Sequence, residues 1–136
     1  MCIRDRADAD QALQLGIAIG DTLFYSQIVH YENNVPVQIE DRFVNPETAP
    51  DYLRQVLNKQ TPYTYLMDIA PLTAGEHRVE AISASDEQRH LLQLEEHEPC
   101  LLIHRRTWSG SRVVTSARLI YPGSRYQLFG RFTSHG

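Results

Sequence analysis

The chain has 136 residues, of which 42% are hydrophobic, and 13 Lys and Arg against 17 Asp and Glu give a net charge of −4. This length fits one domain with one modest core, and no apolar run approaches the ~20 residues that a membrane helix needs. The acidic balance argues against direct binding to a phosphate backbone, so the chain alone is expected to be a poor nucleic-acid binder.

Cysteine usage and the N-terminal residues add two limits. Cys2 and Cys100 are too few and too far apart for a disulfide framework or a metal knuckle, which favours a reducing, cytoplasmic setting. No secretory signal is visible, because the first ten residues are charged and lack an apolar core. Residues 1–7 match no structural element, so the folded domain is expected to comprise residues 8–136.

The first third of the domain predicts a helix and a hairpin. Apolar spacing indicates a helix over residues 8–15 that Gly16 ends. Two β-branched and aromatic runs, residues 22–31 and 35–44, flank Asn33-Asn34, and Asn tolerates the positive φ of a hairpin turn. These runs are therefore expected to pair as antiparallel strands.

The register of this hairpin decides which side chains share a face. A three-residue bulged loop puts His30 opposite Gln38, whereas a two-residue turn shifts the pairing by one residue. The bulged register also puts Ile28 opposite Glu40. We favour it because it sends the apolar side chains of the hairpin to the core. Glu40 then faces a ligand or forms a surface ion pair with Arg42, and both roles stay open.

Two helices are expected in the middle of the chain. The first runs to Leu57 with either Thr48 or Asp51 as its N-cap, and the second begins with Thr61 as N-cap and Pro62 at the first helical position. The spacing in the second helix predicts that Met67 and Ile69 point to the core.

The remaining elements define the fold class. A strand over residues 76–84 and a helix over 85–94 precede a hairpin of residues 100–108 and 113–121, and a short strand is expected at 125–129. The order of helices and strands predicts an α+β fold, an antiparallel sheet packed with helices.

Polar residues are mixed into both faces of the last long strand. Thr115, Arg118 and Tyr121 are therefore candidates for a partly buried polar pocket, because a strand that is wet on one side usually sorts apolar and polar residues more cleanly. A surface sheet with ordinary polar residues is the open alternative.

Motifs for catalysis or metal binding are missing from the sequence. The six histidines include no HExxH and no pair at helical ligand spacing. There is no GxSxG elbow and no GxGxxG or phosphate loop, and Cys100 lies in an apolar strand. We therefore expect no catalytic residue, no metal and no cofactor.

From Leu13 onward the chain resembles the UTRA domain, the effector-binding half of GntR-type transcription regulators of the HutC subfamily. The residues that carry the resemblance are LGIAIGDTLFYSQIVHYENNVPVQIEDRFVNP, TPYTYL, EAISAS and RRTWSGSRVVTSARLIYPGSRYQLFGRF. The resemblance implies a chorismate-lyase-like fold without lyase activity, enclosing a small-molecule pocket. In full-length members a winged helix-turn-helix domain precedes it, and that half is missing here.

The resemblance also implies where the ligand is bound. The implied contacts are Ile28, His30, Glu40, Thr61, Tyr63, Thr115 and Tyr121. Relatives that bind sugar phosphates carry arginines at the first two of these positions, so a phosphosugar is disfavoured. A smaller, flat ligand with an imidazole and one carboxylate suits the substitution, and urocanate is that molecule.

The expected pose places the two ends of urocanate on different strands. Glu40 and His30 suit the imidazole, because a carboxylate accepts its N–H. Arg106 suits the carboxylate if the turn at Ser109-Gly110 sets it beside Thr115.

The resemblance thus implies the sensing domain of a bacterial repressor of histidine catabolism, with no enzyme activity. Its partners would be a small-molecule effector, a second copy in a homodimer, and DNA only through the missing N-terminal domain. A small lyase-like enzyme acting on an aromatic carboxylate and a regulator that senses a different metabolite are the alternatives. Glu40 is the carboxylate that lyase chemistry would use.

Overall fold

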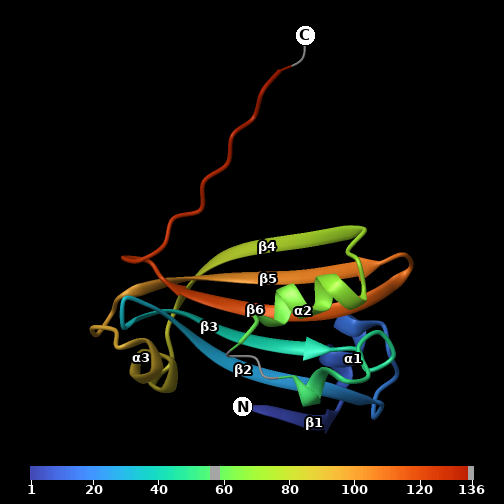
Figure 1. Ribbon diagram of the computed structural model, residues 1–136. Helices are drawn as coiled ribbons and strands as arrows, with labels where there is room; N and C mark the ends of the chain where they lie inside the picture. Colours follow the sequence, from blue (N-terminus) through green and yellow to red (C-terminus); the bar gives the residue numbers. More distant parts are fainter. Residues whose placement is uncertain (56–58, 135–136) are drawn as a thin grey trace.

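In the computed structural model, which describes residues 1–55 and 59–134, six antiparallel strands form one sheet in the order β1-β2-β3-β6-β5-β4 (Figure 1). The strands are β1 (Cys2–Arg6), β2 (Thr22–Glu32), β3 (Val35–Val44), β4 (Ala74–Ser83), β5 (Pro99–Ser109) and β6 (Arg112–Pro122). The helices are α1 (Ala9–Leu15), α2 (Pro62–Ile69) and α3 (Asp86–Leu92), with a 3₁₀ turn η1 (Tyr52–Arg54). This architecture confirms the predicted α+β class. None of the described helices is long and apolar enough to cross a membrane.

Helices cover both faces of the sheet (Figure 1). On one side, called the α2 face here, Leu66 of α2 and Tyr52 of η1 pack around Phe24. On the other side, called the α1–α3 face, Leu15 of α1 lies in one apolar cluster and Leu92 of α3 in another. Because successive side chains of a strand alternate between faces, the strand register decides which polar groups reach the α2 face.

Capping residues set the boundaries of the three helices. Asp8 accepts a hydrogen bond from the backbone N–H of Gln11 at the start of α1, and Gly16 ends that helix with φ at 67°. Thr61 caps α2 in front of Pro62, and Ser85 caps α3. Thr61 as the N-cap of α2 and Gly16 as the end of α1 were both predicted, and the structure confirms both.

Both long hairpins contain a bulge, and each bulge shifts the register by one residue. In the first hairpin, Asn33 and Asn34 form a two-residue turn with φ at 51° and 65°. The bulge opposite the His30–Tyr31 step then sets His30 opposite Gln38. The predicted pairing is confirmed, although the extra residue lies in β3 and not in the turn.

The second hairpin has its bulge close to the turn. Ser109 pairs with Arg112 and Trp108 with Val113, but Thr107 pairs with Thr115. Val114 is therefore the extra residue. Without this bulge Arg106 would lie opposite Thr115, which is the predicted arrangement and is wrong.

Four other predictions differ from the structure. Cys2–Arg6 is not outside the fold, because it forms edge strand β1 paired with β2. The helix predicted to run to Leu57 from Thr48 or Asp51 is only the short turn η1, and residues 56–57 lie outside the described residues. The strand predicted at 125–129 is a turn followed by an extended segment. Met67 and Ile69 are exposed, since Tyr65 and Leu66 form the buried side of α2.

Candidate functional site

A buried chain of polar groups crosses the α2 face between β2, β3 and β6. Glu40 accepts hydrogen bonds from His30 Nε2 at 2.9 Å and from Arg42 Nε at 2.8 Å. Arg42 Nη1 donates to Thr115 Oγ1 at 3.1 Å, and this hydroxyl donates to the Phe43 carbonyl at 3.0 Å. Glu40 and Arg42 are only 5% and 2% exposed. They form the ion pair that the sequence left open, but it is buried.

The environment of Glu40 keeps its carboxyl ionised. Burial acts to raise the pKa, but the hydrogen bond from His30 and the charge and hydrogen bond of Arg42 outweigh it and hold the pKa below the ordinary value. Because each carboxylate oxygen already accepts one bond, Glu40 is a poor candidate for a proton donor. Each oxygen still has a second lone pair with which to accept an N–H.

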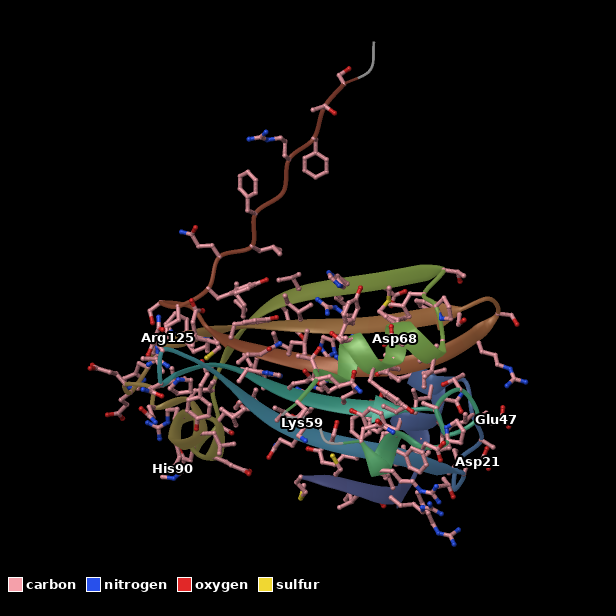
Figure 2. All side chains as sticks on the ribbon, viewed as in Figure 1. Asp21, Glu47, Lys59, Asp68, His90 and Arg125 are labelled. Carbon is pink, nitrogen blue, oxygen red and sulfur yellow. The ribbon has the colours of Figure 1, made fainter. Side chains whose placement is uncertain are left out.

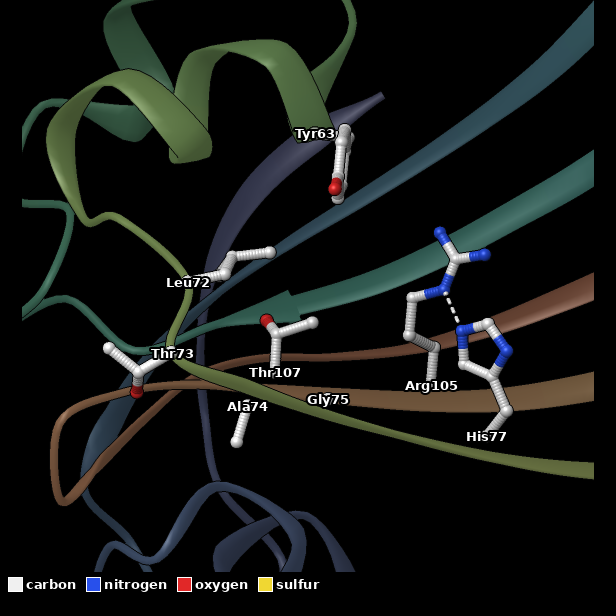
Figure 3. A pocket seen from close by; sticks show the side chains of 8 residues that line it. All are labelled: Tyr63, Leu72, Thr73, Ala74, Gly75, His77, Arg105 and Thr107. Carbon is white, nitrogen blue, oxygen red and sulfur yellow. Dashed lines mark hydrogen bonds between the residues drawn. The ribbon is translucent and has the colours of Figure 1, made fainter. Parts of the chain in front are cut away.

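Next to this polar chain, a cavity of about 520 Å³ lies between α2 and the strands β4 and β5 (Figure 3). Its volume is in the range of small-molecule pockets. Figure 3 shows Tyr63 extending from α2 toward the strands and Arg105 rising from β5. The lining residues are Tyr63, Leu72, Thr73, Ala74, Gly75, His77, Arg105 and Thr107.

Arg105 brings a positive charge to this cavity. Its Nε donates to His77 Nε2 at 2.8 Å (Figure 3). Partial burial and the charge of Arg105 lower the pKa of His77, so this imidazole is a neutral acceptor. Among residues 1–55 and 59–134, no carboxylate oxygen lies within 4 Å of the Arg105 guanidinium, although Arg106 has Glu76 and Arg42 has Glu40. The terminal nitrogens of Arg105 are therefore available to an anion.

Thr107 adds a polar atom that lacks a partner. Its side chain is 3% exposed and lines the cavity, and its hydroxyl has no hydrogen-bond partner within the described part of the chain. A buried hydroxyl without a partner costs about 1–3 kcal/mol, so such groups are rare in stable folds unless a ligand or water completes them.

Tyr121 lies on the same face of the sheet and is influenced by both charged groups of the site. Its hydroxyl accepts a hydrogen bond from Gln38 at 3.0 Å. Burial and the neighbouring Tyr126 raise the pKa of Tyr121, the charge of Arg105 opposes this rise, and Glu40 adds to it. Arg105 and Glu40 are thus both within electrostatic reach of one hydroxyl.

Most of the predicted site residues share the α2 face. By register, Ile28, His30, Glu40, Thr115 and Tyr121 all project to it, and Tyr63 faces it from α2. Thr61 is at the start of α2, where its hydroxyl caps Thr64 N at 3.2 Å. Arg118 is exposed and lies on the α1–α3 face, so the polar pocket does not include it.

The structure contradicts the predicted placement of Arg106 beside Thr115. It pairs with Ser116, lies on the α1–α3 face, bonds to Glu76 at 3.1 Å and stacks on Trp108. The residues that the sequence reasoning missed are Arg105, His77 and Thr107. One signal was available for Arg105. Glu76 on the neighbouring strand can form an ion pair only with the arginine on its own face of the sheet, which leaves the arginine on the opposite face without this partner.

Comparison with known proteins agrees with this fold. Residues 3–127 match the model of the UTRA domain. The C-terminal domain of a histidine utilization repressor from Pseudomonas syringae superposes with a TM-score of 0.94 at 57% identity, covering 98% of this chain and 95% of that one. The effector domain of PhnF from Mycobacterium smegmatis has a TM-score of 0.91 at 16% identity, covering 98% and 84%, which shows a shared fold.

The chain belongs to the UTRA domain family. Within it, the chain is similar to proteins named histidine utilization repressor. The one from Pseudomonas putida is 60% identical over 129 residues, which cover 95% of this chain and 52% of that protein. The one from Klebsiella aerogenes is 57% identical over 129 residues, 95% of this chain and 54% of that protein. The chain thus spans about half the length of these relatives.

Proposed function

We propose that this chain is the small-molecule-sensing domain of a bacterial transcriptional repressor of histidine utilisation, and that the effector binds on the α2 face. The names of the relatives and the UTRA match support the regulatory role. The observation that carries the binding site is Arg105, a cation without a carboxylate partner among the described residues, in a cavity that is also lined by Thr107, whose buried hydroxyl has no hydrogen-bond partner among these residues.

The cavity chemistry suits a flat molecule with one carboxylate. A guanidinium binds a carboxylate with two parallel N–H donors, and Thr107 can add a third. Tyr63 and Leu72 supply apolar surface. Urocanate combines a carboxylate with an imidazole on a planar linker, so it is the effector that we assign.

The sheet register supports a second polar contact for this ligand. Arg105 pairs with Ala117, and Ala117 pairs with Arg42, so the two arginines lie in one row with a small side chain between them. Because neighbouring strands are ~4.8 Å apart, the Cα atoms of the two arginines are roughly 10 Å apart. A urocanate carboxylate on Arg105 would thus point its imidazole toward Glu40, the partner of Arg42.

The same geometry favours binding over catalysis. The enzyme alternative needs a carboxyl group that exchanges a proton with the substrate near neutral pH. The pKa of Glu40 is held low, and both of its oxygens accept hydrogen bonds from His30 and Arg42. A weakly basic, fully ionised carboxylate orients a ligand better than it transfers a proton.

Operator binding belongs to the other half of the protein in this proposal. The chain covers about half of its relatives and has a net charge of −4, which is unsuited to a DNA backbone. A preceding DNA-binding domain would read the operator in the cytoplasm, and a two-fold dimer would match a palindromic site.

Calorimetric titration of the domain with urocanate, histidine and N-acetylglucosamine 6-phosphate tests the assignment. Urocanate should bind, and the phosphosugar should not, because Arg105 is the one arginine among the described residues that line the cavity. Ultraviolet absorbance of urocanate and of chorismate should stay constant on incubation with the protein. Turnover of either compound would overturn the proposed regulatory role. Binding of the phosphosugar without binding of urocanate would overturn the assignment of urocanate as the effector.

A further inference from the structure

A second cavity lies on the α1–α3 face, on the opposite side of the sheet from the proposed effector site. The two helices of this face stand at its two ends, and Figure 2 shows His90 of α3 and Asp21, which follows α1, at opposite ends of the sheet. Next to α1 is a cavity of about 290 Å³, with α1 as one wall and the strands β3, β6, β5 and β4 as its floor. Its volume is close to the lower limit of small-molecule pockets, so it suits a smaller molecule than the cavity of the α2 face does.

A row of three basic side chains crosses the floor of this cavity. Arg78 of β4 lies opposite His104 of β5, and His104 lies opposite Arg118 of β6. Because neighbouring strands are ~4.8 Å apart, the Cα atoms of the two arginines are roughly 10 Å apart. Arg118, which the mixed polarity of its strand marked as a candidate pocket residue, therefore lines a cavity on this face and not the cavity of the α2 face.

The two arginines of this row have no ion-pair partner within the described part of the chain. The carboxylates nearest to them in the sheet are bonded to other groups. Asp41, which lies opposite Arg118 on β3, accepts a hydrogen bond from the Tyr25 hydroxyl at 2.7 Å. Glu80 accepts one from His104 Nε2 at 2.8 Å. Both guanidiniums thus keep N–H donors that can bind an anionic group of a ligand.

The wall that α1 contributes has the opposite charge. Asp10 is in the first turn of α1, lines the cavity, and forms no ion pair with the residues that the structure describes. Gln14 follows one turn later and also lines the cavity. Glu80 adds a second carboxylate on the β4 side. With His104 uncharged, the two arginines and the two carboxylates of the lining balance, so the cavity has separate positive and negative parts and no net charge.

We propose that this cavity binds a free α-amino acid as a zwitterion, at a site distinct from the effector site of the α2 face. Because α1 packs on β6, we assign the ligand carboxylate to Arg118 and the ligand ammonium to Asp10. Arg78 adds a second positive charge on the carboxylate side. The ring of Phe43 supplies apolar surface for the ligand side chain.

The pairing of charges in the lining selects this class of ligand. A purely anionic molecule such as a phosphate would meet the two carboxylates, and a purely cationic molecule would meet the two arginines. A molecule that carries both charges on adjacent atoms is complementary to both parts of the cavity. The small volume of the cavity excludes larger zwitterions.

Thermal unfolding of the 136-residue chain with each protein amino acid at about 10 mM tests the proposal, followed by calorimetric titration of those that stabilise the fold. At least one amino acid should raise the unfolding midpoint and bind. Its N-acetyl derivative lacks the ammonium and its decarboxylated amine lacks the carboxylate. Each of these should bind at least about ten-fold more weakly than the amino acid itself.

Substitutions in the lining locate the site. Arg118→Met and Asp10→Asn should each weaken binding of the amino acid by at least about ten-fold. Arg112→Met is the matched control, because Arg112 is an exposed arginine of the same strand that does not line the cavity, and it should leave the affinity unchanged. Arg105→Met changes the opposite face of the sheet and should also leave it unchanged. Circular dichroism checks that each variant is folded, and Asp10→Asn keeps the test intact if Arg118→Met does not fold.

The outcomes separate this site from the proposed effector site. Absence of binding by every amino acid, or equal affinity of the wild type and the folded lining variants, would overturn the second site. Loss of amino-acid binding in Arg105→Met but not in the lining variants would place the ligand on the α2 face and would overturn it as well. Arg118→Met should bind urocanate as the wild type does. A protein that binds an amino acid through Arg118 but does not bind urocanate would overturn only the effector assignment.

Discussion

Arg105 and Arg106 are adjacent in sequence but lie on opposite faces of the sheet with different partners. Arg105 donates to the neutral His77 in the cavity of the α2 face, whereas Arg106 is paired with the Glu76 carboxylate and stacked on Trp108. Alternation along β5 separates the two side chains, and the bulge at Val114 decides which one shares a face with Thr115. One extra residue in β6, Val114, thus determines that Arg105 and not Arg106 lies on the face of Thr115.

Glu40→Gln is predicted to destabilise the fold. It removes the counter-charge of Arg42, which is 2% exposed and bonded to Glu40 at 2.8 Å. Loss of one member of a buried pair leaves an uncompensated charge, so the free energy of unfolding should fall by about 3 kcal/mol in urea titrations. Glu80→Gln is the matched control: Glu80 pairs with His104 at the exposed edge strand, and its loss should change stability by less than about 0.5 kcal/mol. Equal effects of the two substitutions would contradict a buried role for Glu40.

The pH dependence of stability should carry the signature of Glu40. Because its pKa in the folded chain is below the ordinary value of 4.5, the unfolded chain binds more protons in the interval between the two values. The stabilisation from Glu40 is therefore complete above that ordinary pKa and is lost as the pH falls through the folded pKa. The difference in unfolding free energy between wild type and Glu40→Gln should shrink when urea titrations are repeated at decreasing pH. A difference that is constant down to the acid transition would show that Glu40 has no shifted pKa.

Several elements could be predicted from local signals in the sequence. Asn33-Asn34 adopts the positive φ values of a hairpin turn, Gly16 ends α1 and Thr61 caps α2, because these effects depend on a few consecutive residues. Strand β1 could not be predicted in this way, since its five exposed residues become a strand only by pairing with β2.

The site was predicted less completely because it depends on register. The bulge that shifts His30 to Gln38 follows from the need to bury the apolar side chains of that hairpin. No such pattern marks Val114, since β6 mixes polar and apolar residues on both faces. Arg106 was therefore chosen in place of Arg105. The strand-like pattern after Arg125 has a different outcome, because residues 126–134 include apolar side chains but pair with none of the described strands.

Thr107→Val should have opposite effects on stability and on binding. The free protein loses a buried hydroxyl that has no partner among the described residues, so its unfolding free energy should rise by about 1 kcal/mol. If this hydroxyl donates to the effector carboxylate, affinity for urocanate should fall about three- to ten-fold.

Thr115→Val is the control for this substitution. Thr115 lies opposite Thr107 on β6, but its hydroxyl accepts from Arg42 and donates to the Phe43 carbonyl. Its loss should therefore lower stability by about 1–3 kcal/mol. Thermal unfolding with and without urocanate measures both variants. A Thr107→Val variant that is less stable yet binds normally would show that the hydroxyl serves the fold and not the ligand.

The most direct test of the effector site compares Arg105→Met with Arg106→Met by calorimetric titration of urocanate. Both substitutions remove one charge and keep an unbranched apolar side chain, but the two residues lie on opposite faces of the sheet and have different partners. Arg105→Met should weaken urocanate binding by about 1.5–3 kcal/mol, or roughly 10- to 150-fold, because a charge-assisted contact is lost. Arg106→Met should leave the affinity within about three-fold of the wild type. A large loss with Arg106→Met and none with Arg105→Met would contradict the site on the α2 face.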